Sequence, residues 1–511
     1  MGIFLFMISL LTYINAFTNG FMFDDFTCLF GQYSVAGRSF ADIFMHNQAG
    51  FYRPVGHLLL WISAGVFGNN VIGYHAVNFC LFLLMLFFFV IIAEKLTQNR
   101  MLAFMAGLLY AVHPINGMSV NYITACNNSS YVLLMQLSLI SYIYYTESRR
   151  KYLYVLSFIG FILAFLAHEI ALLLPFFLIA YRIVCKGARL KPSFYSVAPF
   201  IVLAGCYFLF RSNGTAVFVH KINIPISATG DLMAYFSTWV DLIRWYFTQL
   251  IYPAKVVFLW SAKMGSARFI VNAAIFLLGS IGFCYFIIKN GKNWKSFALL
   301  LFLGGCAPTF YSCFVFSPKV WPYFEPHWMY FSQMGFFILA GAFFYYIIKR
   351  NRLVGHLLIV AVLCLFIVCS WQYNSKWRTQ EEYSRYWLSV NQGNLTAFYG
   401  LGTSLMDKGD YAGAVDVFRS ANTLLGNISV AMAVALGHCY DELGNGTEAL
   451  VIFNTVTKEN PGNALVYHYK GLYLMKRGDH ALAREAFLKS VKLDPKFSLS
   501  YPYLQDTRLK K

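Results

Sequence analysis

The chain has 511 residues, of which 59% are hydrophobic, 19% aromatic and only 12% charged. Soluble domains carry about 25% charged residues, so this composition excludes both a soluble globular protein and a disordered one. The formal net charge is +18, from 40 Lys and Arg against 22 Asp and Glu. Of these, 24 basic residues but only 9 acidic ones lie before Trp371, within the apolar part of the chain. That distribution indicates membrane topology and excludes nucleic acid as the partner.

Apolar stretches of about 20 residues recur up to Trp371, and each can cross a hydrocarbon core of about 30 Å. Basic clusters lie in five short loops between them, which the positive-inside rule places in the cytoplasm. We therefore expect a cytoplasmic N-terminus and an extracytoplasmic segment after Trp371. The segment 231–260 is either one helix at the outer surface or a hairpin that adds two crossings. The eleven predicted crossings are 3–20, 71–93, 101–118, 129–146, 152–168, 170–184, 194–210, 268–288, 296–315, 328–348 and 354–371.

The acidic residues of the membrane part gather on the predicted outer side. This side includes the long loop 21–70, in which we expect juxtamembrane helices. Any chemistry is therefore expected to be extracytoplasmic. Seven of the nine acids lie there: Asp24, Asp25, Asp42, Glu169, Asp231, Asp241 and Glu325.

The composition after Trp371 is that of ordinary soluble helix, and a 34-residue repeat appears. Gly437 and Gly471 are one such pair, and Phe453 and Phe487 are another. A small residue lets two helices approach, and the Phe fills the space between them. The repeats present a concave groove for an extended peptide, unless they are a purely structural cap. We expect a linker helix at 372–394, three tetratricopeptide repeats at 395–428, 430–463 and 464–497, and a capping helix at 498–511, which together form the repeat domain 395–511.

Asp24 and Asp25 directly follow the first predicted crossing, 3–20. Adjacent carboxylates are costly at a membrane surface unless they have a function or lie in water. One of them suits the role of general base toward an acceptor hydroxyl. The other suits the positioning of that hydroxyl, of a divalent metal such as Mg²⁺ or Mn²⁺, or of the first carboxylate.

Further polar residues lie at the outer ends of other predicted crossings. Arg53 stands between Tyr52 and Pro54, and a guanidinium held in this way suits a phosphate. His168-Glu169 lies between two apolar runs with almost no loop, so it is either functional or an ion pair that joins two helices. The remaining candidates at this depth are His75, Asn78, His113, Asn116, Glu325 and His327.

These motifs, in this order, resemble the transmembrane and tetratricopeptide-repeat O-mannosyltransferases and their bacterial relatives, which belong to the GT-C glycosyltransferases. Asn19-Gly20-Phe21 with Phe23-Asp24-Asp25 resembles the start of the family. Tyr52-Arg53-Pro54 matches its Y-R-P element, and His113-Pro114 resembles its H-P element. His168-Glu169 stands in place of Lys-Glu. His327-Trp328-Met329-Tyr330 resembles the E-R-Y-L-Y segment, with His327 in place of Arg.

The resemblance implies an all-α polytopic GT-C domain over residues 1–371. It implies transfer of a sugar from a polyprenyl-phosphate donor to a hydroxyl of a protein, with the peptide bound by the repeat groove. Asp24 would be the base and Asp25 its support. The donor's phosphate and sugar would contact Tyr52, Arg53, His113, His168, Glu169, Glu325, His327 and Tyr330. The His substitutions argue against carrying mannose over as the sugar.

Two other functions remain open. The same chemistry on a lipid-linked glycan or polysaccharide depends less on the repeats, and a non-enzymatic membrane scaffold or transporter does not need the outer acids. The short loops and compact repeats favour a bacterial inner membrane, with the repeat domain in the periplasm, over the endoplasmic reticulum. Membrane lipid is a partner in every case.

Overall fold

The protein is described by a computed structural model over residues 1–31, 34–35, 38–45, 52–214, 229–263, 268–315, 321–426, 428–495 and 498–505. It is an all-α fold, as the sequence predicts, with one two-stranded antiparallel sheet in the described part. The chain divides into two compact units. Unit 1 holds Met1–Asp25 and Val35–Arg378, and unit 2 holds Phe26–Ser34 and Thr379–Lys511.

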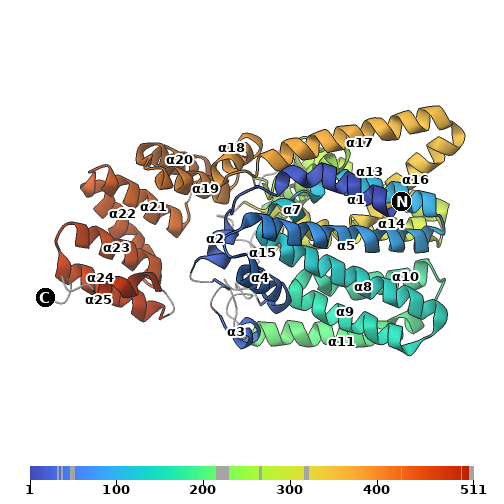
Figure 1. Cartoon of the computed structure of the whole chain (residues 1–511), viewed down its shortest axis with the longest axis horizontal. Coiled ribbons are helices and arrows are strands. Elements are labelled where there is room, and N and C mark those ends of the chain that lie inside the picture. The colour runs from blue at the N-terminus through green and yellow to red at the C-terminus, as the bar shows by residue number, and fades with distance from the viewer. Residues whose placement is uncertain are drawn as a thin grey trace. The chain divides into compact units, whose positions relative to one another are not determined.

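The elements before Arg378 are α1 (Gly2–Tyr13), η1 (Ile14–Ala16), α2 (Asp24–Leu29), α3 (Phe40–Met45), α4 (Pro54–Phe67), α5 (Val71–Thr97), α6 (Arg100–Val112), η2 (Pro114–Asn116), α7 (Met118–Asn121), η3 (Ile123–Ala125), α8 (Cys126–Ser148), α9 (Lys151–Ala167), η4 (Glu169–Leu173), α10 (Leu174–Val184), α11 (Leu190–Gly214), α12 (Thr229–Ile251), β1 (Trp260–Ser261), α13 (Phe269–Asn290), α14 (Trp294–Gly304), α15 (Ala307–Val315), β2 (Tyr323–Phe324), η5 (Pro326–Met329), α16 (Met334–Arg350) and α17 (Arg352–Ser375). Figure 1 shows α5, α8, α9 and α11 running side by side in unit 1.

Within the described part of the chain, three helices are long and apolar enough to cross a membrane: α5, α13 and α17. The pair formed by α6 and residues 114–121, bent by 60°, would make a fourth among the described residues. The prediction of eleven crossings is therefore not confirmed. The other apolar segments do form helices, but several have only 10–17 residues, and α8 begins with the polar run Asn127, Asn128, Ser129 and Ser130.

The apolar surface of α13 supports membrane association. Ile270 is 82% exposed and Ile288 is 80% exposed, and Asn272 is the only buried residue of the helix. Soluble monomers rarely expose an apolar patch of this extent.

Basic loops meet at one end of unit 1. Glu147, near the end of α8, binds Lys95 at 2.7 Å and Lys186 at 3.2 Å, so two of the basic loops meet at a carboxylate that directly precedes a third, at 149–151. The 23 residues of α8 span about 33 Å at 1.5 Å per residue. Its first residue, Cys126, therefore lies about one hydrocarbon thickness from the basic end.

The segment 231–260 contains one helix, α12 (Thr229–Ile251), and not a hairpin of two helices, and the chain after Ile251 leads into β1. In the sheet, Trp260 lies opposite Phe324. Since Glu325 directly follows β2, this pairing fixes the entry to η5.

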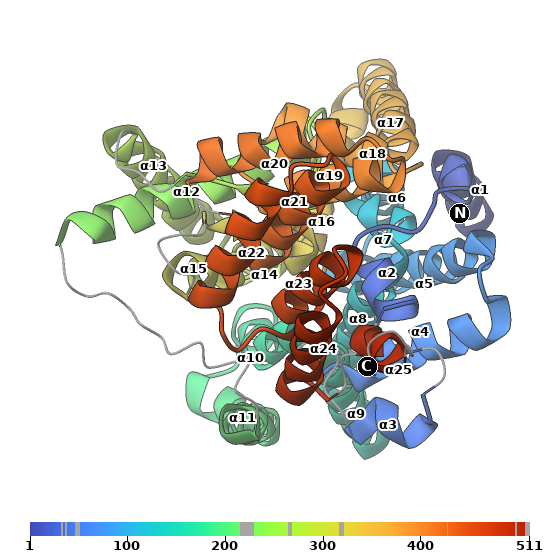
Figure 2. The ribbon, with the colours of Figure 1, turned by 90° about the vertical axis from the view of Figure 1, so that its left-hand side faces the viewer.

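Unit 2 holds three helix pairs, at the residues predicted for the repeats. They are α19 (Leu395–Asp407) with α20 (Tyr411–Leu425), α21 (Val430–Glu442) with α22 (Gly446–Glu459), and α23 (Ala464–Lys476) with α24 (His480–Leu493). Figure 2 shows them stacked in sequence order. The predicted close approach is present. A Cβ added to Gly402 would lie 2.2 Å from the ring of Phe418, and one added to Gly471 would lie 2.8 Å from the ring of Phe487.

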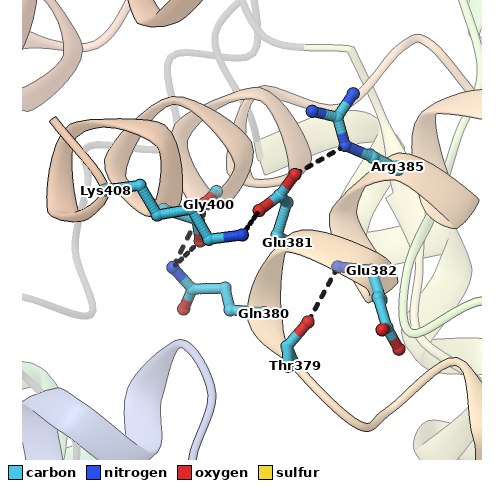
Figure 3. A network of polar contacts seen from close by, with 8 residues as sticks. Thr379, Gln380, Glu381, Glu382, Arg385, Gly400 and Lys408 are labelled. Atoms are coloured by element: carbon cyan, nitrogen blue, oxygen red, sulfur yellow. Dashed lines mark hydrogen bonds and ion pairs between the residues drawn. The ribbon is translucent and has the colours of Figure 1, made fainter. Parts of the chain in front are cut away.

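Two helices occupy the predicted linker 372–394: the end of α17 and α18 (Gln380–Val390). Polar contacts attach α18 to α19 (Figure 3). Glu381 accepts from Arg385 at 2.9 Å and from Lys408 at 2.5 Å, and Gln380 donates to the carbonyl of Gly400 at 3.2 Å.

The predicted capping helix is a short turn, η6 (Ser498–Ser500), followed by α25 (Tyr501–Gln505), and residues 506–511 lie outside the described part. Tyr503 of α25 stacks on Phe487 with ring centroids 4.9 Å apart. The last apolar face of the repeats is therefore covered.

Candidate functional site

Asp25 is a buried carboxylate held by the backbone. Oδ2 accepts the N–H of Met22 at 3.0 Å, and Oδ1 accepts the N–H of Thr124 at 2.9 Å. Burial raises the pKa of Asp25 to about 7, although both backbone bonds act to lower it. With 1% of its surface exposed, Asp25 fixes the loop of Met22 against the residues that precede α8.

Asp24, in contrast, is exposed to solvent at the first turn of α2. Its backbone N–H donates to the hydroxyl of Tyr122 at 3.1 Å. The protein that surrounds the carboxylate raises its pKa, while the Tyr122 hydroxyl and the charge of Arg53 act to lower it. Of the two acids, Asp24 is therefore the one that an external hydroxyl can reach.

The residue before Asp24 has a strained backbone. Phe23 has φ +44°, which is uncommon for a bulky side chain. Its ring stacks on Phe258 at 6.3 Å, and Phe258 also packs edge-on against Tyr122 at 5.3 Å. The segment after α12 thus supports both residues that hold Asp24.

Arg53 and Glu169 form a bidentate pair. Nε of Arg53 donates to Oε2 at 3.1 Å, and Nη2 donates to Oε1 at 2.7 Å. Arg53 precedes α4, whose first residue is Pro54, and Glu169 begins η4. Burial acts to lower the pKa of Arg53, but the charge and hydrogen bonds of Glu169 outweigh it and raise that pKa, so the guanidinium stays charged.

Two histidines lie beside this pair. Nδ1 of His168 accepts the N–H of Ile170 at 3.2 Å, so the proton of its neutral ring is on Nε2. The rings of His168 and His327 are 5.4 Å apart. Nδ1 of His327 is 3.1 Å from Oε2 of Glu325, an ion-pair distance, although the approach is not aligned as a hydrogen bond.

The structure therefore brings six predicted residues into one electrostatic network. The pKa of Glu325 is raised to about 8 by burial, against the charge of Arg53, and the charges of Asp24 and Glu169 raise it further. Burial lowers the pKa of His327, as do the charges of His168 and Arg53. The members are Asp24, Arg53, His168, Glu169, Glu325 and His327.

Three predicted donor contacts have other partners. His113 caps η2 through Nδ1, and its Nε2 bonds the carbonyl of Leu250 at 3.1 Å. Tyr330 donates to the carbonyl of Ile115 at 3.1 Å, and Tyr52 donates to the carbonyl of Phe44 at 3.0 Å. Contact of these three side chains with the sugar donor stays a prediction, and their hydrogen bonds within the protein do not favour it.

A network of asparagines, which the sequence does not predict, supports the acid loop, meaning the segment 19–25 that carries Asp24 and Asp25. Asn19 donates to Asn121 at 2.8 Å, and Asn121 donates to Asn374 at 2.7 Å. His75 bonds the carbonyls of Asn19 and Val120, and Asn78 donates to the carbonyl of Tyr122 at 2.7 Å. His75 and Asn78 are therefore scaffold residues, and only their concentration near one end of the crossings signalled their importance.

No group of three or more His, Cys, Asp or Glu side chains in the described ranges is arranged to hold a metal ion. Asp24 and Asp25 remain the only pair predicted as metal ligands, and Asp25 already has both oxygens on backbone N–H groups.

Comparison with known proteins identifies the repeats. Residues 405–471 and 464–497 match the tetratricopeptide repeat family. Such repeats generally mediate contacts between proteins, which is compatible with a protein partner. No curated protein and no solved structure matches the chain.

Proposed function

We propose that the protein is a membrane glycosyltransferase of the GT-C type. It moves a sugar from a polyprenyl-phosphate donor to a hydroxyl of a protein on the extracytoplasmic face. The observation that carries the proposal is the different environment of two adjacent acids, Asp24 and Asp25. Backbone N–H groups occupy both oxygens of Asp25, whereas Asp24 is exposed and within the electrostatic reach of Arg53.

Asp24 takes the proton of the acceptor hydroxyl as that hydroxyl attacks the anomeric carbon. The raised pKa of Asp24 makes its carboxylate a stronger base toward that hydroxyl. The hydroxyl of Tyr122 and the stacked ring of Phe23 fix its position. A positioned base typically contributes a factor of about 10² to 10⁴ to the rate.

Arg53 attracts the donor phosphate, with His168 and His327 beside it. The bidentate bond to Glu169 orients the guanidinium, and planar guanidinium groups suit phosphate oxygens. The exposed apolar surface of helices such as α13 suits contact with lipid tails.

The repeat unit supports a protein as the acceptor. Tyr411, His438 and Tyr469 come from α20, α21 and α23, and their rings follow one another at 6.1 and 6.0 Å. These rings are partly exposed, so they offer a surface for a peptide. A lipid-linked glycan as the acceptor, or a scaffold without activity, would not need them.

Transfer from a panel of short polyprenyl-phosphate hexoses to peptides tests this function in the purified full-length protein. Transfer that Asp24→Asn abolishes, at an unchanged thermal midpoint, is the expected result. Full activity of Asp24→Asn would overturn the assignment of the base. Loss of peptide transfer alone in His438→Ala/Tyr469→Ala would favour the protein acceptor over a lipid-linked glycan.

A further inference from the structure

The chain passes between the two units at three places, and two of them involve the acid loop. One lies inside the short helix α2, which begins in unit 1 with Asp24 and Asp25 and continues in unit 2 from Phe26. Another follows Arg378, from which the chain leads into α18. The proposed base, Asp24, is therefore separated by one residue from the unit that carries the repeats.

The acid loop is also hydrogen-bonded to the residue at which the chain enters unit 2 for the second time. The N–H of Gly20 donates to the carbonyl of Arg378 at 3.2 Å. A Cβ added to Gly20 would lie 3.2 Å from that same oxygen, which is closer than ordinary van der Waals contact. Beside this bond, the side chain of Asn19 donates to the carbonyl of Asn374, in the last turn of α17, at 3.1 Å. The acid loop is thus held against the segment that leads into α18.

Phe23 lies between two fixed points of the acid loop. On one side is the bond of Gly20, and on the other is Asp25, whose carboxylate accepts the N–H of Thr124 at 2.9 Å. The backbone of Phe23 is strained, with φ +44°, and such a conformation persists only where its surroundings hold it. Loss of either fixed point therefore lets Phe23 relax, and the next residue, Asp24, moves with it.

We propose that Gly20 is a positioning residue for transfer, and that its bond to Arg378 links the position of Asp24 to the segment that enters unit 2. The inference rests on the proposed function and deepens it, because unit 2 then contributes to the chemical step as well as to peptide binding. Binding of a peptide at the repeats affects KM, whereas the position of the base affects kcat. An acceptor too short to be bound by the repeats can therefore separate the two contributions.

Hydrogen exchange of the full-length protein, followed by mass spectrometry, tests the positioning without any substrate. In Gly20→Ala the amides of the acid loop should exchange about tenfold faster or more, while those of α5 keep their wild-type rates. Gly65→Ala is the matched control, because a Cβ added to Gly65 meets nothing within 4 Å. Unchanged exchange in the acid loop, or faster exchange throughout unit 1, would overturn the proposal.

The effect on catalysis is tested with one polyprenyl-phosphate hexose and two acceptors. One is a peptide long enough to contact the rings of Tyr411, His438 and Tyr469, and the other is N-acetylserine amide. Gly20→Ala should lower kcat about tenfold or more with both acceptors, because a displaced base slows the chemical step. The KM values for donor and peptide should stay near those of the wild type. A raised KM without a lower kcat, or a loss of kcat with the peptide alone, would contradict the positioning role.

Asn19→Ala is the second variant, in case Gly20→Ala does not fold. It removes the side-chain bonds to Asn121 and to the carbonyl of Asn374 while Gly20 itself is unchanged. It should lower kcat with both acceptors in the same way, and a wild-type kcat would count against the proposal. A wild type that transfers to neither acceptor would instead refute the proposed function, whereas the exchange rates do not depend on activity.

Discussion

The backbone N–H of Thr124 donates to the carboxylate of Asp25 at 2.9 Å, across 99 positions of sequence. This bond joins the loop before α2 to the residues that precede α8. Because Met22 supplies a second N–H, Asp25 is engaged on both oxygens. Its neighbour Asp24 is thereby presented to solvent in a fixed position.

The two acids should consequently respond in opposite ways to the same substitution. Asp25→Asn replaces one acceptor oxygen with an N–H₂ group that faces a backbone donor, and should cost about 1–3 kcal/mol of stability. Asp24→Asn should abolish transfer and leave stability unchanged. Thermal unfolding in detergent, measured beside transfer for both variants, checks this pair. Equal midpoints for the two variants would contradict it.

The bidentate pair of Arg53 and Glu169 gives a second prediction. Arg53→Lys keeps the charge but loses the bidentate geometry, so donor binding should weaken by about 1.5–3 kcal/mol, which is tenfold or more in KM. The matched control is Arg244→Lys, because Arg244 binds Asp241 through one nitrogen at a more exposed site. A KM that is equally affected in both variants would speak against a phosphate contact at Arg53.

A third prediction concerns the pH dependence of stability. The pKa values of Asp25 and Glu325 are raised to about 7 and about 8, whereas both are near 4 when unfolded. Between about pH 4 and the folded values the folded state binds more protons than the unfolded state, so these groups stabilise the protein at low pH, and that contribution is lost progressively as pH rises from about 4 until it is gone above about 7 for Asp25 and about 8 for Glu325. His57, whose pKa is lowered to about 3, acts in the opposite direction, but only below about pH 6.5.

The thermal midpoint should therefore fall between about pH 6.5, above which His57 no longer opposes the change, and about pH 8, where the fall ends, and the fall should be shallower in Glu325→Gln. Glu382→Gln serves as the control and should follow the wild type. A midpoint that rises over this interval would show that other groups dominate.

The strained turn at Phe23 gives a fourth prediction. Phe258→Ala removes the ring that packs on both Phe23 and Tyr122, so Asp24 should lose its fixed position. We expect kcat to fall by roughly 10- to 100-fold with little change in donor KM, because a misplaced base affects the chemical step. Phe276→Ala, at a 45% exposed position of α13, should leave both constants near their wild-type values.

The repeat glycines give a fifth prediction. Gly402→Ala places a Cβ 2.2 Å from the ring of Phe418, and overpacking of this kind costs about 1–3 kcal/mol. At Gly462 nothing lies within 4 Å, so Gly462→Ala should be close to neutral. Chemical denaturation followed by circular dichroism compares the two, and a similar midpoint would contradict the packing role of Gly402.

The repeats could be predicted from sequence because the spacing of Gly and Phe indicates a contact between two helices that are close in the chain. Gly402 and Phe418 lie only 16 positions apart, so the spacing itself carries the contact. The crossings were overcounted because a hydrophobic run does not distinguish a helix that meets lipid from one that packs within protein. The helix α8 illustrates this, since its first residues are buried amides and hydroxyls.

The candidate site was predictable only in part. Asp24, Arg53 and Glu169 stood out because charged residues are rare in an apolar chain. Asn121 and Asn374 could not be recognised, because asparagine gives no signal of a partner 253 positions away. His113 was assigned to the donor site by its depth and its Pro, yet both of its ring nitrogens bond the protein.

The length of helix α8 also has a consequence for how the sugar donor reaches the proposed site. On the proposed topology, its start lies beside the acid loop on the outer side and its end lies with Lys95 and Lys186 on the cytoplasmic side. A sugar-lipid assembled at the cytoplasmic face would start about 33 Å from the proposed site, measured along α8. The proposed function therefore requires a separate reaction that turns the sugar-lipid over in the bilayer, and the rate of that reaction would limit transfer however fast the chemistry at Asp24 becomes.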